Sequence, residues 1–105
     1  MHVVFFEVTL KPGKKPAYLD IAAGLRDLLK DQDGFLSIER FQSLTDPEKL
    51  LSLSFWRDED AVTNWRNQEQ HRVAQDAGNI DLFQDYRITV AQSLRSYTKD
   101  DGHKT

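Results

Sequence analysis

Residues 33–56 read DGFLSIERFQSLTDPEKLLSLSFW and carry the clearest structural signal in the chain. Two runs within this stretch, 35–44 and 49–56, are rich in aromatic and aliphatic side chains and predict two strands. Between them, Thr45-Asp46-Pro47-Glu48 has the residue types of a turn, so we expect the strands to form a hairpin. Gly34 can take the left-handed conformation in which helices often end. The stretch therefore predicts a helix end followed by an antiparallel pair of strands.

The segment before the hairpin predicts one strand and one helix. Residues 2–10, HVVFFEVTL, form a strand-like run that stops at Lys11-Pro12-Gly13, a turn signal. Residues 15–31 have apolar side chains at helical spacing, and Pro16 suits the first turn, where its missing N–H costs little. The apolar positions are Tyr18, Ile21, Ala22, Leu25, Leu28 and Leu29. They form one face of a predicted amphipathic helix.

The segment after the hairpin predicts a second helix. Asp58 is a plausible N-cap, and the acidic residues that follow it complement the positive end of a helix. The first apolar positions are Ala61, Val62 and Trp65. Because the pattern then weakens, we expect a break or bend near Asn67 and an end at Gly78.

The remaining residues complete one domain. Residues 80–84 are expected to form a connection, 85–97 a long last strand, and 98–105 a polar, frayed C-terminal tail. The resulting order, βαββαβ, is that of the ferredoxin-like arrangement. We therefore predict a single α+β domain over residues 1–97, in which two helices cover one face of a four-stranded antiparallel sheet.

Composition excludes several classes of function. The net charge is −3 and no basic stripe is present, so nucleic acid is not an expected partner. The absence of cysteine excludes disulfides, thiolate metal sites and thiol nucleophiles. The N-terminus lacks the features of a secretory signal or a membrane span, so we expect a cytoplasmic protein without a membrane partner.

Both faces of the predicted sheet are apolar. In the first strand Val4, Phe6 and Val8 share one face, while Val3 and Phe5 share the other with Glu7. Two helices can cover only one face, and burying each large apolar side chain is worth about 1.5–3 kcal/mol. We therefore expect a homodimer in which the sheets meet face to face; the alternative is a monomer whose open face is blunted by scattered Ser and Arg.

Two residues are candidates for proton transfer. If the face that carries Glu7 meets the helices, burial would raise its pKa and suit it as a general base; alternatively, Glu7 forms an ion pair with Arg87 or Arg95. His71, on the second helix, could hold or deprotonate a substrate hydroxyl, or it could be an ordinary surface histidine. The chain lacks a two-histidine metal spacing, so no dedicated metal site is expected.

Aromatic residues are candidates for a ligand pocket. Trp56 ends the third strand and Trp65 lies on the helix just beyond it, so both could wall an aromatic ligand, although tryptophan is also a common core residue. Phe5 could pack the same ring, and Arg87, inside a strand, is a candidate substrate clamp. No phosphate-binding loop, dinucleotide fingerprint or serine-hydrolase elbow is present.

A set of residues spread from the first strand to Tyr97 also resembles a known family, the antibiotic biosynthesis monooxygenase superfamily. These residues are Gly34-Phe35-Leu36, Ser54-Phe55-Trp56, Ala61 to Trp65, His71, Ala74-Gln75, Gly78 and Tyr86-Arg87. The resemblance implies a ferredoxin-like dimer with a barrel-like core, a dimeric α/β barrel, and a pocket in each subunit between its sheet and helices.

The resemblance implies two kinds of chemistry. One member type oxidises polycyclic phenols to quinones with O₂ and no cofactor; its strand-three Trp matches Trp56, while Ser52 and Val62 replace its Asn and Tyr. The other type degrades haem; its helix Trp matches Trp65, while Glu7 replaces its Asn and its His lies further from the Trp than His71 does.

The main hypothesis is therefore a cofactor-independent monooxygenase acting on a small phenolic or quinol-like substrate. Trp56, Trp65 and Phe5 would pack the ring, and His71 or Glu7 would take the hydroxyl proton. The alternatives are a non-enzymatic dimeric ligand-binding protein and, less favoured, a haem-degrading monooxygenase.

Overall fold

The computed structural model describes the backbone of residues 1–75 and 82–101, and the side chains of residues 1–68 and 82–101. The elements follow one another as β1 (His2–Leu10), α1 (Lys15–Leu29), β2 (Phe35–Gln42), β3 (Lys49–Trp56), α2 (Glu59–Gln75) and β4 (Phe83–Gln92). The predicted βαββαβ order is thus confirmed. The strands form one sheet in the order β2-β3-β1-β4, and every neighbouring pair is antiparallel.

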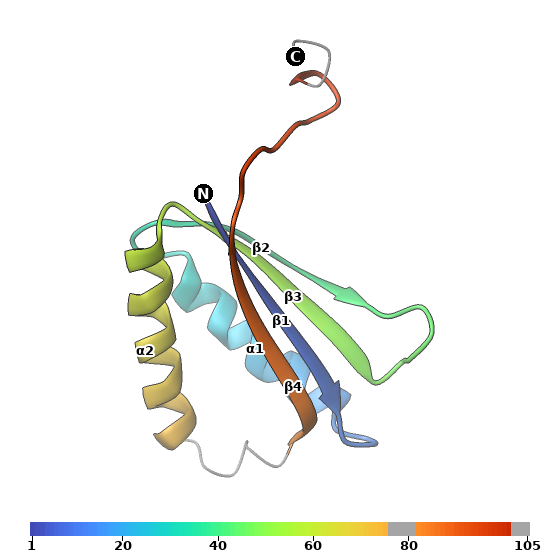
Figure 1. The fold of residues 1–105 in the computed structure, drawn as a ribbon. Helices are drawn as coiled ribbons and strands as arrows, with labels where there is room; N and C mark the ends of the chain where they lie inside the picture. The colour runs from blue at the N-terminus through green and yellow to red at the C-terminus, as the bar shows by residue number, and fades with distance from the viewer. Residues whose placement is uncertain (76–81, 102–105) are drawn as a thin grey trace.

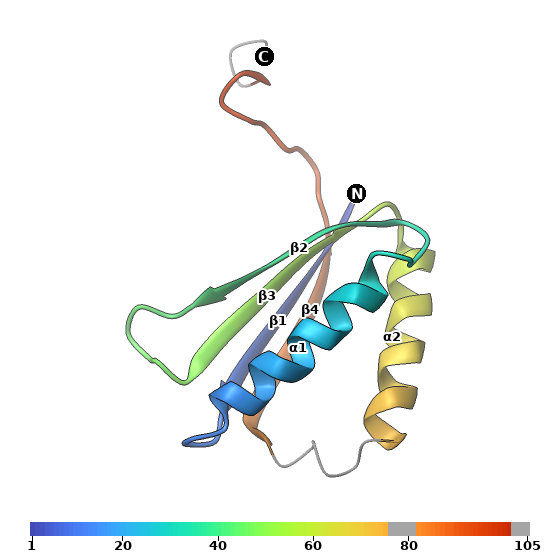
Figure 2. The same cartoon turned by 180° about the vertical axis from the view of Figure 1, so that it is seen from behind.

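The molecule has two layers. Figures 1 and 2 show the sheet on one side and both helices on the other, with the opposite face of the sheet bare. We call the face of the sheet that the helices cover the helix face, and the bare face the open face. Side chains alternate along β1, so Val4, Phe6 and Val8 contact the helix layer. The odd-numbered β1 residues, among them Phe5 and Glu7, therefore lie on the open face.

Local sequence signals set the connections that the hairpin stretch predicts. Gly34 adopts a φ of 82° in the turn between α1 and β2, four residues after the C-cap Lys30, and its carbonyl accepts a hydrogen bond of 2.8 Å from the Arg57 amide. Asp46 accepts a hydrogen bond of 2.9 Å from the Glu48 amide and so closes the β2–β3 turn. Asp58 accepts one of 2.9 Å from the Ala61 amide, which confirms it as the N-cap of α2.

Several element bounds differ from the prediction: α1 ends at Leu29 and not at 31, and β2 ends at Gln42 and not at 44. Helix α2 runs without a break from Glu59 to Gln75, and Asn67, where a bend was expected, is an exposed residue within it. Strand β4 begins at Phe83, inside the expected connection, because Phe83 pairs with Leu10 of β1. It ends at Gln92 and not at 97, because Gln92 pairs with His2 at the very start of β1. The expected helix end at Gly78 lies outside the described residues.

The core consists of two clusters on the helix face. Near the start of α1, Val8, Leu10 and Tyr18 pack with Leu50 and Leu82. At the other end of the sheet, where α2 begins, Leu29, Trp56, Ala61, Val62 and Trp65 form the second cluster. No helix in the described part of the chain is long and apolar enough to span a membrane.

Candidate functional site

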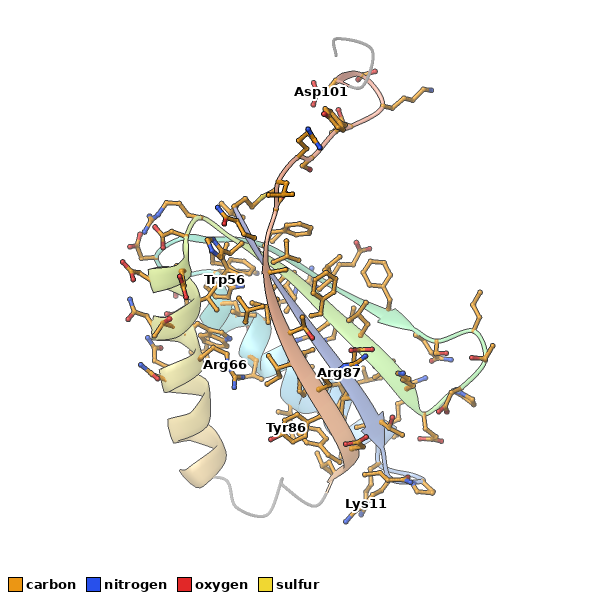
Figure 3. All side chains as sticks on the ribbon, viewed as in Figure 1. Lys11, Trp56, Arg66, Tyr86, Arg87 and Asp101 are labelled. Atoms are coloured by element: carbon orange, nitrogen blue, oxygen red, sulfur yellow. The ribbon has the colours of Figure 1, made fainter. Side chains whose placement is uncertain are left out.

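The two tryptophans meet on the helix face. Trp56 ends β3 and Trp65 lies near the start of α2; their ring centroids are 6.3 Å apart and the planes are inclined by 27°. Phe35 contacts Trp56 edge-on at 5.3 Å, and the indole N–H of Trp56 donates to the Ser54 hydroxyl at 3.0 Å. With 1% and 7% of their surfaces exposed, Trp56 and Trp65 form a packed wall at the α2 end of the core. Figure 3 shows Trp56 at this end of the sheet, beside α2.

Glu7 and Arg87 lie on the opposite side of the sheet. Their Cα atoms are paired across β1 and β4, and Arg87 Nε donates to Glu7 Oε2 at 2.8 Å. Lys49 of β3 approaches the other carboxylate oxygen at 4.0 Å. The hydrogen bond from Arg87 holds the pKa of Glu7 below its ordinary value, and the charges of Arg87 and Lys49 act in the same direction. The prediction that Glu7 is a base with a raised pKa is therefore wrong, and the ion-pair alternative with Arg87 is confirmed.

The open face also carries a hollow of about 450 Å³. Its walls combine apolar side chains with the Glu7 charge cluster, and the lining residues are Phe5, Glu7, Phe41, Gln42, Ser43, Lys49, Leu50, Leu51 and Thr89. Phe5, Glu7 and Arg87 are thus brought together, but on the other side of the sheet from Trp56 and Trp65. The prediction that all five share one pocket is wrong, because strand alternation sends odd-numbered β1 residues away from the helices. The pocket expected between the sheet and the second helix stays a prediction.

Sequence reasoning overlooked an aromatic group on the helix face. Phe6 of β1 lies 6.0 Å from Phe83 and 5.9 Å from Tyr86, measured between ring centroids, and Tyr18 of α1 lies 5.8 Å from Phe83. Tyr86 is 58% exposed, and Val90 further along the same face of β4 is 47% exposed. Figure 3 shows Tyr86 near the lower end of β4. The signal was available, because Tyr86, Ile88 and Val90 alternate along β4.

Sequence reasoning also assigned no role to His2. Its Cα atom is paired with that of Trp56, so the imidazole lies on the helix face beside the tryptophan wall. The Nδ1 atom is buried without a hydrogen-bond partner. The charge of His2 contributes to the lowered pKa of Asp58, although the hydrogen bond from Arg57 is the main cause. The parity of strand β1 alone would have placed His2 on the same face as Val4 and Phe6.

His71 belongs to α2, but its side chain lies outside the described residues. Among the residues that the structure does describe, no three His, Asp or Glu side chains are grouped as ligands for a metal ion. The chemistry that the described residues offer on the helix face is therefore apolar and aromatic packing, next to the imidazole group of His2 on β1.

The protein is a ferredoxin-like α+β domain that carries an aromatic surface on its helix face. Comparison with known proteins identifies its family. The sequence profile described as "Antibiotic biosynthesis monooxygenase" matches residues 1–77. The chain belongs to this family.

One relative agrees with this assignment, and two solved structures share the fold. The chain is 41% identical over 96 residues to the jasmonate monooxygenase ABM of Pyricularia oryzae, an alignment that covers 91% of this chain but only 45% of that protein. Its fold is similar to that of PA3566 from Pseudomonas aeruginosa, with a TM-score of 0.75, 23% identity and coverage of 90% of this chain and 94% of the other. It is also similar to Rv0793 from Mycobacterium tuberculosis, with a TM-score of 0.77, 17% identity and coverage of 92% and 98%.

Proposed function

We propose that the protein is a cofactor-independent monooxygenase that oxidises a small aromatic substrate of the phenol or quinol type. The observation that carries the proposal is the partly exposed aromatic group of Phe6, Phe83 and Tyr86, in a chain that belongs to a monooxygenase family. Aromatic rings prefer edge-on or offset contacts with other rings, and such contacts add to the free energy of burial. A planar ring is therefore the ligand that this surface suits best.

The proposed reaction converts a phenol and O₂ into a quinone and water. A base removes the hydroxyl proton, the resulting anion supplies electrons to O₂, one oxygen atom enters the ring and the other leaves as water. His71 is the proposed base, because Glu7 is held as a carboxylate by Arg87 on the other face of the sheet. The apolar surroundings of the helix face would favour the delocalised anion and exclude water. In this proposal the protein requires neither haem nor a metal ion.

The proposed active form is a homodimer joined through the open faces of the two sheets. The open face bears Phe5, Leu51, Leu53 and Phe55, and Phe41 there is 42% exposed. An apolar sheet surface of this kind is typical of an interface. Association of the open faces would leave the helix face of each copy accessible to its ligand.

A second candidate substrate class follows from one relative. The identity of 41% to a jasmonate monooxygenase favours jasmonate or a compound of similar size and shape as the substrate. Because the chain covers 45% of that relative's length, this assignment is a proposal about a domain. Jasmonate has a ring and an apolar side chain that would pack on the same aromatic surface.

The test is oxygen uptake, measured with an oxygen electrode, on a panel of phenols, quinols and jasmonate. We expect stoichiometric uptake with at least one compound and its loss in H71Q, whereas H103Q, a control near the C-terminus, retains it. H2Q tests the imidazole that β1 carries on the helix face in the same assay. Thermal stabilisation by a panel compound without any uptake would contradict the proposal and favour the ligand-binding alternative. A Soret band on titration with haem, followed by reductant-dependent haem loss, would instead favour haem degradation.

A further inference from the structure

The C-terminal segment leaves the body of the protein in a direction that calls for a partner. Residues 93–101, which we call the arm, continue from β4 and extend away from the sheet in Figure 1. The Ser93 amide donates to the Met1 carbonyl at 2.8 Å, which is the last rung of the sheet. Further along the described arm, Thr98 and Asp101 exchange hydrogen bonds with each other and close a local turn.

Two apolar side chains on the arm are exposed. Leu94 is 86% exposed and Tyr97 is 53% exposed. Holding an extended segment in one conformation costs about 1–2 kcal/mol per residue in backbone entropy, so an ordered arm needs a surface to pack on. The apolar side chains indicate that this surface is itself apolar.

The hollow on the open face is such a surface, but the arm of the same chain extends away from it in Figure 1. The arm starts where Gln92 pairs with His2, whereas the hollow extends to Lys49, which pairs with Thr9. The seven residue steps of β1 between these two positions span about 23 Å. The hollow therefore runs from the middle of the sheet, at Phe5 and Thr89, to the end that lies opposite the arm.

We propose that, in the dimer, the arm of one copy lies across the second copy and that Leu94 and Tyr97 fill its open-face hollow. If the sheets meet face to face about a two-fold axis perpendicular to the strands, the arm end of each sheet lies over the hollow end of the other. Residues 93–97 span up to about 17 Å when extended, enough to cross from the end of one sheet onto its partner.

Packing considerations favour this occupant. Stable interfaces are packed about as densely as protein interiors, so a hollow of about 450 Å³ between two sheets has to be filled. A leucine and a tyrosine match its apolar walls, Phe5, Phe41 and Leu51, and the tyrosine hydroxyl has polar groups to meet at the rim. The alternative two-fold axis, parallel to the strands, would place hollow on hollow and leave both unfilled. This inference depends on the proposed dimer but not on the proposed reaction.

Engineered disulfides test the placement directly, because the chain contains no cysteine. We would mix the single variants K49C, at the hollow, and S96C, on the arm, oxidise them at micromolar concentration, and map cross-linked tryptic peptides by mass spectrometry. The control mixture pairs S96C with D27C, whose parent aspartate on the outer surface of α1 is 82% exposed. We expect the peptide that joins positions 49 and 96 to exceed the 27–96 control at least tenfold.

Sedimentation equilibrium provides the second measurement. The arm variant L94S/Y97S should dimerise at least tenfold more weakly than the parent, whereas L19S, which changes an apolar residue on α1 that is 43% exposed, should not. A parent protein that is monomeric at tens of micromolar would overturn the inference together with the dimer. A dimer in which the 49–96 link is no more frequent than the control link would overturn the arm placement alone. Both the dimerisation and the cross-linking result are independent of whether the protein takes up oxygen, so they test the arm placement separately from the proposed reaction.

Discussion

Replacing Gly34 by alanine should destabilise the protein by more than any single methyl group normally does. Gly34 has a φ of 82°, and a Cβ atom built there would lie 2.5 Å from the Cβ atom of Ala61 in α2. The left-handed conformation costs a residue with a Cβ atom about 1–2 kcal/mol. The steric overlap between the exit of α1 and the first turn of α2 adds about 1–3 kcal/mol. The expected loss in the free energy of unfolding is therefore about 2–5 kcal/mol.

The two contributions can be separated with a double variant. In G34A/A61G the overlap is removed while the strained conformation remains, and the glycine in α2 adds a penalty of up to about 1 kcal/mol. We therefore expect the double variant to be more stable than the sum of the two single changes predicts, by about 1–3 kcal/mol. G24A is the matched control, because Gly24 lies inside α1 and a Cβ atom added there would meet nothing within 4 Å. It should stabilise the protein by about 0.5–1 kcal/mol.

Urea unfolding followed by tryptophan fluorescence is the assay, since Trp56 and Trp65 are both buried where α2 meets the sheet. Every variant is measured at the same protein concentration, because dimerisation would make the midpoint concentration-dependent. If G34A unfolds within about 0.5 kcal/mol of the parent, or if G34A/A61G shows no coupling, the close approach of the α1–β2 turn and α2 at Gly34 is refuted.

Three further predictions concern the start of α2 and the tryptophan wall. Arg57 donates hydrogen bonds to Asp33 and Asp58 and lowers the pKa of each carboxyl group. The stability that these ion pairs contribute is therefore fully present above the ordinary pKa of about 3.9 and is lost as the pH falls through the lower pKa values of the folded protein. R57Q should make stability, recorded by circular dichroism, less sensitive to acid. D58A should lower the urea midpoint by removing the N-cap of α2, whereas D58N should largely retain it. W56F leaves the buried Ser54 hydroxyl without its indole donor and should cost about 1–3 kcal/mol beyond the lost packing, part of which W56F/S54A recovers in the same unfolding assay.

Local signals in the sequence were sufficient for most of the fold. Gly34, Asp46 and Asp58 each act through a hydrogen bond or a backbone angle within a few residues, so their roles can be inferred without knowledge of distant partners. The ends of β4 depend on β1, at the other end of the chain. Phe83 joins the strand because Leu10 is there to pair with it, and Gln92 ends it because β1 begins at His2. No pattern within residues 83–97 contains that information.

The candidate site was harder to predict because alternation groups side chains without saying which group the helices cover. The sequence correctly placed Val3, Phe5 and Glu7 together on one face of β1, but both faces are apolar and the pattern does not rank them. Once β1 is packed with its even-numbered residues on the helices, every odd-numbered residue moves to the open face. The sequence did not determine which face of β1 packs on the helices, and for this reason it did not separate Glu7 and Phe5 from Trp56 and Trp65.

That parity also determines which task each face can perform. A general base with a raised pKa needs an apolar environment without a cation, whereas Glu7 has Arg87 at 2.8 Å and Lys49 at 4.0 Å. A carboxylate that is already paired in this way can be covered by a second sheet at a lower desolvation cost than an isolated one. Glu7 is thus better suited to fixing the alignment of β1, β3 and β4 beneath the proposed partner copy than to taking a proton. The helix face, with Tyr86 exposed and the buried Nδ1 atom of His2 lacking a hydrogen-bond partner, retains the groups that would contact the proposed aromatic substrate.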